Sequence, residues 1–252
     1  MEKIRVGVIG VGNMGRHHVR VYSELEGAEL VAIADTNRVN ALKISEKYNC
    51  NYYSDFETMI NKEKIDAVSI ATPTFLHKTI AVKCLNKGIH VLVEKPIALT
   101  VEDAQEIIRA AKEKKLKLLV GHIERFNPVV VKLKELIRTK SFGKPLIIST
   151  IRVGTFPKQI RDVNVVTDLG VHDIDVINYL FDDTPKLLFS QAIPGADNRE
   201  HAAQILLNYN NHRLGIIQIN WITPAKRRKI TINCTEGYLE ADYLNQEITC
   251  YT

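Results

Sequence analysis

The chain has 252 residues, of which 45% are hydrophobic and 25% are charged, a composition typical of a globular, enzyme-sized protein with one large or two modest domains. Its formal net charge of +5 is mild for this length; it favours an anionic ligand, but without a nucleic-acid motif it gives no reason to expect nucleic acid as a partner. No apolar run approaches the roughly 18 residues that span a bilayer, and Met1-Glu2-Lys3 leads into the first strand without an apolar signal region, so we expect no membrane partner and a cytoplasmic location.

The first predicted strand, residues 4–9, runs directly into a glycine-rich turn. The turn reads Gly10-Val11-Gly12-Asn13-Met14-Gly15, and Asp35 closes the next apolar run. In this pattern the first glycine allows a tight turn, the second lets the backbone approach a pyrophosphate, and the third lets the helix pack closely on the strand. The N–H groups at the start of that helix then face the phosphates. The pattern predicts a dinucleotide site; a purely structural glycine-rich turn is the alternative.

Asp35 bears on which dinucleotide is bound. Its carboxylate can accept hydrogen bonds from the adenosine ribose hydroxyls, whereas a 2'-phosphate would meet its negative charge. Arg38 could swing toward such a phosphate, stack on adenine or lie in solvent. We therefore expect NAD, with NADP less favoured.

Strands and helices alternate through the first half of the chain. Strands are predicted at 4–9, 29–34, 66–71, 89–93 and 117–121, and helices at about 13–26, 36–48, 75–87 and 100–115. Thr100 with Asp103 marks a helix start, and Gly88 marks a helix end. Such alternation predicts a parallel sheet covered by helices on both faces.

The run Val91-Leu92-Val93-Glu94-Lys95-Pro96 places Lys95 just beyond a predicted strand. Open α/β sheets bind ligands at this carboxyl edge, so Lys95 is expected near the cofactor, with a solvated turn lysine as the alternative. Pro96 permits a cis peptide bond.

The pattern changes near residues 121–127. A helix is predicted from Pro128, followed by strands at 145–153, 186–193, 202–209, 213–222, 228–234 and 238–243 and one helix at 168–181. The turns Asn210-Asn211 and Glu236-Gly237 join strands at hairpin distance. We therefore expect an α/β protein with a doubly wound parallel sheet in residues 1–122 and an α+β domain on a mainly antiparallel sheet in residues 123–252.

The helix at 168–181 carries a second group of chemically capable residues. Spacings of four and three would place Asp168, His172 and Asp175 on one helical face. Two carboxylates and an imidazole could make an acid/base centre or a metal site. The alternative is that His172 is an ordinary helical histidine without a catalytic role. No second cluster at ligand spacing supports a metal, so none is expected.

Two other features have ordinary interpretations. The cysteines Cys50, Cys84, Cys234 and Cys250 lie far apart without a C-x-x-C pair, which indicates reduced thiols rather than a zinc site or a disulfide framework. The basic run 226–229 could bind phosphate, but without interleaved aromatic residues it is better explained as a solvated strand start.

Taken together, the motifs resemble the glucose-fructose oxidoreductase, inositol dehydrogenase and rhizopine catabolism (Gfo/Idh/MocA) family. The shared segments are Gly10 to Gly15, Asp35, Ala71-Thr72-Pro73, Glu94-Lys95-Pro96 and the D-x-x-x-H of Asp168 and His172, and their order covers nearly the whole chain. The resemblance implies an NAD-binding Rossmann domain followed by a substrate-binding α/β domain whose open sheet mediates oligomerisation. A homodimer or homotetramer is therefore expected.

The resemblance also implies the reaction and its residues. A sugar or cyclitol secondary alcohol would give hydride to nicotinamide, while His172 accepts the hydroxyl proton, Lys95 hydrogen-bonds the developing oxyanion and Asp168 orients one of them. His122 would lie near the nicotinamide, with an ordinary packed histidine as the alternative. The expected cofactor contacts are Gly10, Val11, Gly12, Asn13, Met14, Gly15, Asp35, Arg38, Ala71, Thr72, Pro73, His77, Glu94, Lys95 and His122.

Three segments, residues 121–128, 156–168 and 221–224, resemble the branch of this family that acts on nucleotide sugars. We therefore expect oxidation of a UDP-sugar, at C3 of a UDP-N-acetylhexosamine. The basic stretch from Arg152 to Arg161 would hold the pyrophosphate, with Arg161 foremost. Substrate contacts are expected from Lys95, Arg125, Lys158, Arg161, Asp168 and His172. Inositol or free-aldose oxidation is the alternative within the family, and a non-catalytic NAD-binding scaffold or sensor is the alternative outside it.

Overall fold

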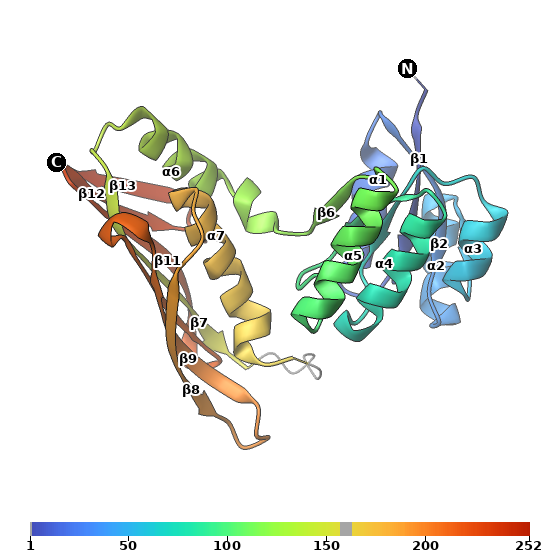
Figure 1. The fold of residues 1–252 in the computed structure, drawn as a ribbon. Helices are drawn as coiled ribbons and strands as arrows, with labels where there is room; N and C mark the ends of the chain where they lie inside the picture. The colour runs from blue at the N-terminus through green and yellow to red at the C-terminus, as the bar shows by residue number, and fades with distance from the viewer. Residues whose placement is uncertain (1, 157–162) are drawn as a thin grey trace. The chain divides into compact units, whose positions relative to one another are not determined.

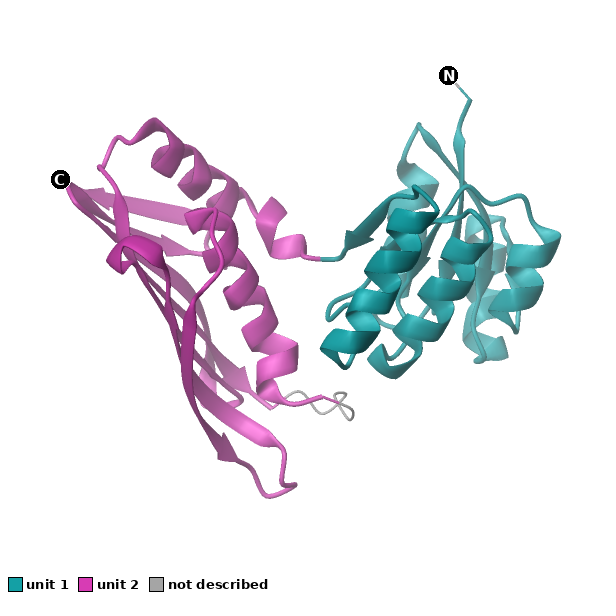
Figure 2. Ribbon diagram, in the orientation of Figure 1, with its two compact units in different colours: residues 1–121 teal, residues 122–252 magenta. Residues whose placement is uncertain are grey.

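The chain folds into two compact units, residues Met1–Gly121 and His122–Thr252 (Figure 2). The structure, a computed structural model, describes residues 2–156 and 163–252. Each unit has its own sheet and its own apolar core, so each is described by itself.

The first unit is built on a six-stranded parallel sheet in the order β3-β2-β1-β4-β5-β6. The strands are β1 (Ile4–Ile9), β2 (Ala28–Ala34), β3 (Asn51–Tyr53), β4 (Ala67–Ile70), β5 (His90–Val93) and β6 (Leu118–Val120). The helices are α1 (Gly15–Glu24), α2 (Arg38–Tyr48), α3 (Phe56–Lys62), α4 (His77–Asn86) and α5 (Val101–Glu113), with a 3₁₀ turn, η1, at Thr74–Leu76. The order reverses beside β1, and doubly wound sheets bind ligands at the carboxyl ends of the strands at such a point.

Two apolar clusters cover the two faces of this sheet. On β1, Val8 belongs to the cluster beneath α1 and α2, whereas its neighbour Ile9 belongs to the cluster with α3, α4 and α5. Successive strand side chains point to opposite faces, so helices bury both sides. This confirms the expected parallel, doubly covered sheet.

The second unit is built on a seven-stranded sheet in the order β13-β12-β11-β7-β10-β9-β8. The strands are β7 (Pro145–Thr155), β8 (Leu187–Pro194), β9 (Glu200–Asn208), β10 (Leu214–Asn220), β11 (Ile222–Cys234), β12 (Gly237–Asp242) and β13 (Glu247–Tyr251). Only the β7–β10 pair among these is parallel, which confirms the mainly antiparallel sheet.

Helices α6 (Pro128–Thr139) and α7 (Val171–Phe181) run along one face of this sheet (Figure 1). Leu133 of α6 and Ile177 of α7 are fully buried in a cluster with Ile148, Ile217 and Ile232 from the strands. Short turns complete the unit: η2 (Ile123–Phe126), η3 (Val166–Gly170) and η4 (Asn210–His212). Helix α6 begins at the predicted Pro128, where Asn127 accepts a hydrogen bond from the Val129 N–H and caps the helix.

Several elements differ from the sequence-based expectation. Strand β3 and helix α3 were not predicted, because three residues are too few to show an alternation of apolar and polar side chains. Strand β11 begins earlier than residue 228, and β13 was not predicted. The helix expected from residue 168 begins as a π-helical turn, η3.

All four cysteines are thiols without disulfide partners. Burial raises the pKa of Cys84 to about 12. In the part of the chain that the structure describes, no helix is long and apolar enough to cross a bilayer.

Candidate active site

The glycine-rich turn joins β1 to α1 in a conformation that side chains would not allow. Gly10 has φ +83°, and a Cβ atom there would lie 2.7 Å from the Ala71 carbonyl oxygen. A Cβ at Gly15 would lie 1.8 Å from the Gly10 carbonyl oxygen. At Gly12, by contrast, a Cβ would meet nothing within 4 Å. The first and third glycines therefore serve close packing, while the second leaves open space where a pyrophosphate can approach the backbone.

Asp35 holds this turn from the end of β2. One carboxylate oxygen accepts the Val11 N–H at 2.7 Å, and the other accepts the Asn37 N–H at 2.7 Å. The Asn40 side-chain amide donates to the Val11 carbonyl oxygen at 3.0 Å. Each carboxylate oxygen has a second lone pair, so Asp35 retains the capacity to accept hydrogen bonds from ribose hydroxyls.

A cavity of about 410 Å³ opens at the carboxyl ends of β1, β2 and β4. Six residues expected to contact the cofactor line it: Gly10, Gly12, Asp35, Ala71, Thr72 and Pro73. The remaining lining residues are Ile9, Ala34, Thr36, Ser54, Asp55, Phe56, Leu76, Thr79 and Ile80. Its size is that of a small-molecule site, and the open space at Gly12 beside the Asp35 carboxylate fits a dinucleotide.

Ser54, Asp55 and Phe56 follow β3 directly, and the sequence analysis did not foresee them. They escaped notice because β3 itself was not predicted. Asp55 adds a second carboxylate to the cavity lining.

The other expected cofactor residues lie outside the cavity lining. Val11 and Gly15 are buried in the turn, whereas Asn13, Met14 and Arg38 are exposed. His77 is buried, with Nδ1 2.9 Å from the Pro96 carbonyl oxygen and Nε2 2.9 Å from the Thr72 carbonyl oxygen. Its ring therefore joins two loops of the first unit, and its nitrogens contact backbone.

Lys95 lies just beyond β5, half-buried, and its peptide bond to Pro96 is cis. The neighbouring Glu94 side chain is buried. One of its oxygens lies 2.9 Å from His18 Nε2, and the other accepts the Lys95 N–H at 3.2 Å. Both oxygens of Glu94 thus contact protein groups, which makes Glu94 a support for Lys95.

In the second unit, His172 lies in the first turn of α7 and Asp168 lies in η3; both are half-buried. A π turn closes hydrogen bonds five residues apart rather than four, so a spacing of four does not place these residues as on an α-helix. His172 and Asp175 both lie in α7 at a spacing of three, so these two residues share a helical face. The Asp175 carboxylate, expected as an acid/base partner, accepts hydrogen bonds from Arg125 Nε at 2.7 Å and Nη2 at 2.5 Å.

Arg125, expected to contact substrate, is thus held by Asp175, and this hydrogen bonding raises the pKa of Arg125. His122 is at the same place, with Nδ1 3.7 Å from an Asp175 carboxylate oxygen. The structure therefore brings His122, Arg125 and Asp175 together.

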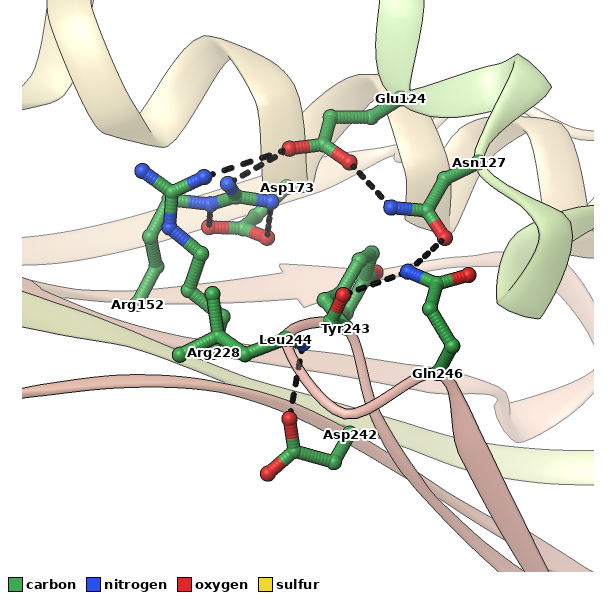
Figure 3. A network of polar contacts seen from close by, with 9 residues as sticks. All are labelled: Glu124, Asn127, Arg152, Asp173, Arg228, Asp242, Tyr243, Leu244 and Gln246. Carbon is green, nitrogen blue, oxygen red and sulfur yellow. Dashed lines mark hydrogen bonds and ion pairs between the residues drawn. The ribbon is translucent and has the colours of Figure 1, made fainter.

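A buried ionic network lies next to His172 in sequence (Figure 3). Arg152 Nε donates to Asp173 at 2.9 Å, Nη2 donates to Asp173 at 3.2 Å, and Nη1 donates to Glu124 at 2.8 Å. Arg228 Nη1 lies 3.9 Å from the same Glu124 oxygen. Burial lowers the pKa of Arg152, but Asp173 and Glu124 outweigh burial and leave the pKa above its ordinary value.

This network removes Arg152 from the basic stretch that was expected to hold a pyrophosphate. The Arg152 side chain is only 3% exposed and is engaged by two carboxylates, so it anchors β7 to α7. Lys158 and Arg161, the other basic residues of that stretch, lie outside the described residues. Among residues 2–156 and 163–252, no group of three or more His, Cys, Asp or Glu side chains could hold a metal ion.

Two family models match the chain. The model described as "Oxidoreductase family, NAD-binding Rossmann fold" matches residues 4–122. The model described as "GFO/IDH/MocA C-terminal domain" matches residues 130–240. Together they cover both units.

Three curated relatives show the range of activities among similar proteins. The UDP-N-acetylglucosamine 3-dehydrogenase of Acidithiobacillus ferrooxidans is 28% identical over 251 residues, covering 100% of this chain and 78% of the relative. The 2,7-anhydro-N-acetylneuraminate hydratase of Mediterraneibacter gnavus is 30% identical, covering 74% and 51%. The inositol 2-dehydrogenase of Mycolicibacterium smegmatis is 34% identical, covering 73% and 54%. The chain thus spans about half the length of the last two.

A solved structure of the A. ferrooxidans UDP-N-acetylglucosamine 3-dehydrogenase has a TM-score of 0.90 to this chain. The superposition covers 100% of this chain and 80% of that structure, at 28% identity. The likeness extends through both units.

Proposed function

The chain belongs to the Gfo/Idh/MocA family of NAD-binding oxidoreductases, and we propose that it oxidises a secondary hydroxyl of a sugar nucleotide, at C3 of a UDP-N-acetylhexosamine. The observation that carries this proposal is the likeness to a UDP-N-acetylglucosamine 3-dehydrogenase over the whole chain, in sequence and in fold. The likeness to inositol 2-dehydrogenase covers only 73% of the chain.

The proposed chemistry assigns a task to each of three residues. Bound in the first unit, NAD would supply the acceptor for the hydride of the carbinol carbon. As the hydride leaves, the hydroxyl must lose its proton, and the His172 imidazole accepts it. The Lys95 ammonium donates a hydrogen bond to the oxygen as negative charge develops there. Asp168 orients one of these two groups.

The remaining contacts belong to the same proposal. Gly10 to Gly15, Asp35 and the Ala71-Thr72-Pro73 turn hold the dinucleotide, with Arg38 at the adenosine. His122 lies near the nicotinamide. Arg125, Lys158 and Arg161 contact the substrate, with Arg161 holding the pyrophosphate. The cytoplasm is the proposed location.

A substrate comparison tests the proposal. The enzyme and NAD are mixed with UDP-N-acetylglucosamine, myo-inositol or glucose, and NADH formation is followed by absorbance. We expect the nucleotide sugar to give the highest kcat/KM. Turnover of myo-inositol or glucose, with no calorimetric binding of the nucleotide sugar to the NAD-loaded enzyme, would replace the proposal by the inositol or aldose alternative.

Substitution of Lys95 and His172 tests the enzyme against a non-catalytic NAD-binding scaffold. Lys95→Ala and His172→Ala are expected to lower kcat by roughly 10²- to 10⁴-fold, the usual contribution of positioned acid/base groups. Both act on the alcohol, so the Kd for NAD should change by no more than a few-fold. Lys95→Arg should also be poor, because a planar guanidinium does not replace a compact ammonium at one oxygen. A near wild-type rate in either alanine variant removes that residue from the mechanism.

The outer face of the second unit's sheet supports an oligomer. On the face that α6 and α7 leave uncovered, Phe189 is 66% exposed, Ile193 58% and Ile222 64%. The same face is hollowed by a cavity of about 460 Å³ with a mainly aliphatic lining. Large exposed apolar patches mark interaction surfaces, and we propose that this face joins copies of the chain in a homodimer or homotetramer.

A further inference from the structure

A chain of polar side chains runs through the interior of the first unit from α1 to the segment that carries Lys95. Tyr22 Oη lies 2.7 Å from Ser69 Oγ, and Ser69 Oγ lies 3.2 Å from His18 Nδ1. His18 Nε2 in turn lies 2.9 Å from Glu94 Oε1. Ser69 is fully buried and Glu94 is 7% exposed. Burial makes an unmade hydrogen bond costly here, so the order of donors and acceptors can be worked out.

The hydrogens of this chain can be assigned from its carboxylate end. An ionised Glu94 only accepts, so His18 Nε2 donates to it. In a neutral imidazole Nδ1 then accepts, and Ser69 donates to it. The Ser69 oxygen accepts from the Tyr22 hydroxyl. Every hydrogen bond in this row of side chains is therefore donated in the direction of Glu94, and each of the four side chains has a hydrogen-bond partner.

The Glu94 carboxylate is also confined on its other sides. Its second oxygen accepts the Lys95 N–H at 3.2 Å. A Cβ atom at Gly121, the residue after β6, would lie 3.1 to 3.2 Å from three atoms of this carboxylate. Glu94 is thus fixed between His18, the Lys95 backbone and the Gly121 backbone.

We propose that His18 is a positioning residue: through Glu94 it fixes the backbone of Lys95, and so joins the helix of the dinucleotide turn to the catalytic ammonium. Neither His18 nor Glu94 touches substrate in this assignment. The inference rests on the catalytic role proposed for Lys95. It explains why a histidine stands in the first turn of α1, where nothing in the glycine motif calls for one.

Two isosteric substitutions separate the two ring nitrogens. The amide nitrogen of Gln reaches about as far as Nε2, whereas that of Asn reaches about as far as Nδ1. His18→Gln therefore keeps the donor to Glu94, and His18→Asn loses it. His17→Asn is the matched control, because His17 is the neighbouring histidine on α1 and is exposed.

The kinetic readout is the turnover of UDP-N-acetylglucosamine, or of whichever sugar the substrate comparison shows to react. We expect His18→Asn to lower kcat on the order of 10- to 100-fold, the scale of a small misplacement of a reacting group. His18→Gln should restore most of that loss, and His17→Asn should match wild type. Calorimetric Kd values for NAD should be unchanged, because the glycine turn and Asp35 are intact.

A second readout needs neither NAD nor substrate. Competitive acetylation with acetic anhydride, followed by mass spectrometry, measures the reactivity of the Lys95 amine in the free protein. Loss of the restraint on Glu94 should speed acetylation of Lys95 in His18→Asn and in Glu94→Gln, but not in His17→Asn. Glu94→Gln also covers the case in which His18→Asn does not fold.

The outcomes are distinguishable. If His18→Asn and Glu94→Gln match wild type in kcat and in Lys95 acetylation while Lys95→Ala is inactive, the positioning role is wrong and the proposed function stands. If Lys95→Ala is fully active, the catalytic role proposed for Lys95 is wrong, and the inference that rests on it is wrong as well. A fall in NAD affinity that accounts for the whole effect of His18→Asn would assign His18 to cofactor binding and overturn the inference.

Discussion

At the scale of single residues, Asp35 performs two tasks with one carboxylate. It fixes the glycine turn through the Val11 N–H and borders the cavity where a ribose would lie. A 2'-phosphate would meet this carboxylate and also Asp55 in the same cavity lining, and like charges at close range are strongly disfavoured. We therefore predict tighter binding of NAD than of NADP in calorimetric titrations.

Asp35→Ala should raise the Kd for NAD by about 10- to 100-fold, which is the loss of affinity that accompanies removal of hydrogen bonds to a charged group. The same variant should narrow the preference for NAD over NADP. His17→Asn serves as the control, because His17 is an exposed residue of α1 that is 18 residues from Asp35 in the sequence. Equal affinity of the wild type for both cofactors would contradict the assignment of Asp35.

Residues with a local pattern could be predicted from the sequence, and residues defined by distant partners could not. Gly10, Gly12 and Asp35 were found because spacing alone encodes the turn. Arg152 was misread as a phosphate ligand, because its partners Glu124 and Asp173 lie 28 and 21 residues away. The side-chain partners of His77 and Glu94, which are Thr72, Pro96 and His18, were also not predicted.

At the scale of elements, α3 depends on the residue that precedes it. Asp55 caps this helix by accepting the Thr58 N–H at 2.8 Å and the Thr58 hydroxyl at 2.9 Å. These hydrogen bonds lower the pKa of Asp55 below its ordinary value. A lowered pKa in the folded state means that the stabilisation is present above the unfolded value, about pH 4, and is lost as the pH falls toward the folded value.

Asp55→Ala should therefore lower the free energy of unfolding by about 1 kcal/mol at neutral pH, the usual loss for a helix cap. The difference from wild type should shrink as the pH falls below about 4. Urea unfolding of the NAD-free protein measures it, and Asp55→Asn, which retains a capping oxygen without the charge, is the control. A wild-type advantage that grows with acidity would show that the cap is not the source.

Helices and strands were predicted correctly wherever they are long enough for their apolar residues to show a helical or an alternating spacing. The five predicted strands of the first unit and the helices between them are present. The short strand β3 and the π turn η3 were not foreseen, since three-residue strands carry no period and π turns have no propensity signal. Because β3 was not predicted, the cavity-lining residues that follow it were not predicted either. Because η3 was not predicted, Asp168 was placed on an α-helix rather than in a π turn.

At the scale of the whole molecule, the uncovered sheet face predicts association. Replacing Phe189 and Ile222 together by Glu should turn the oligomer into a monomer, because it places two charges in an apolar contact. Sedimentation velocity measures the change. Val39→Glu, at a 68% exposed apolar residue of α2, is the matched control and should leave the assembly intact. A double variant that sediments as wild type does would place the interface elsewhere.

The central claim is that the chain removes a hydride from C3 of a nucleotide sugar and gives it to NAD. One relative is named a hydratase, so net transfer to the cofactor must be measured directly. UDP-N-acetylglucosamine carrying deuterium at C3 is incubated with the enzyme and NAD, and the NADH is analysed by mass spectrometry. The account predicts NADH one mass unit heavier than normal, in an amount equal to the 3-oxo sugar formed. NADH without deuterium, or no NADH at all, would contradict it.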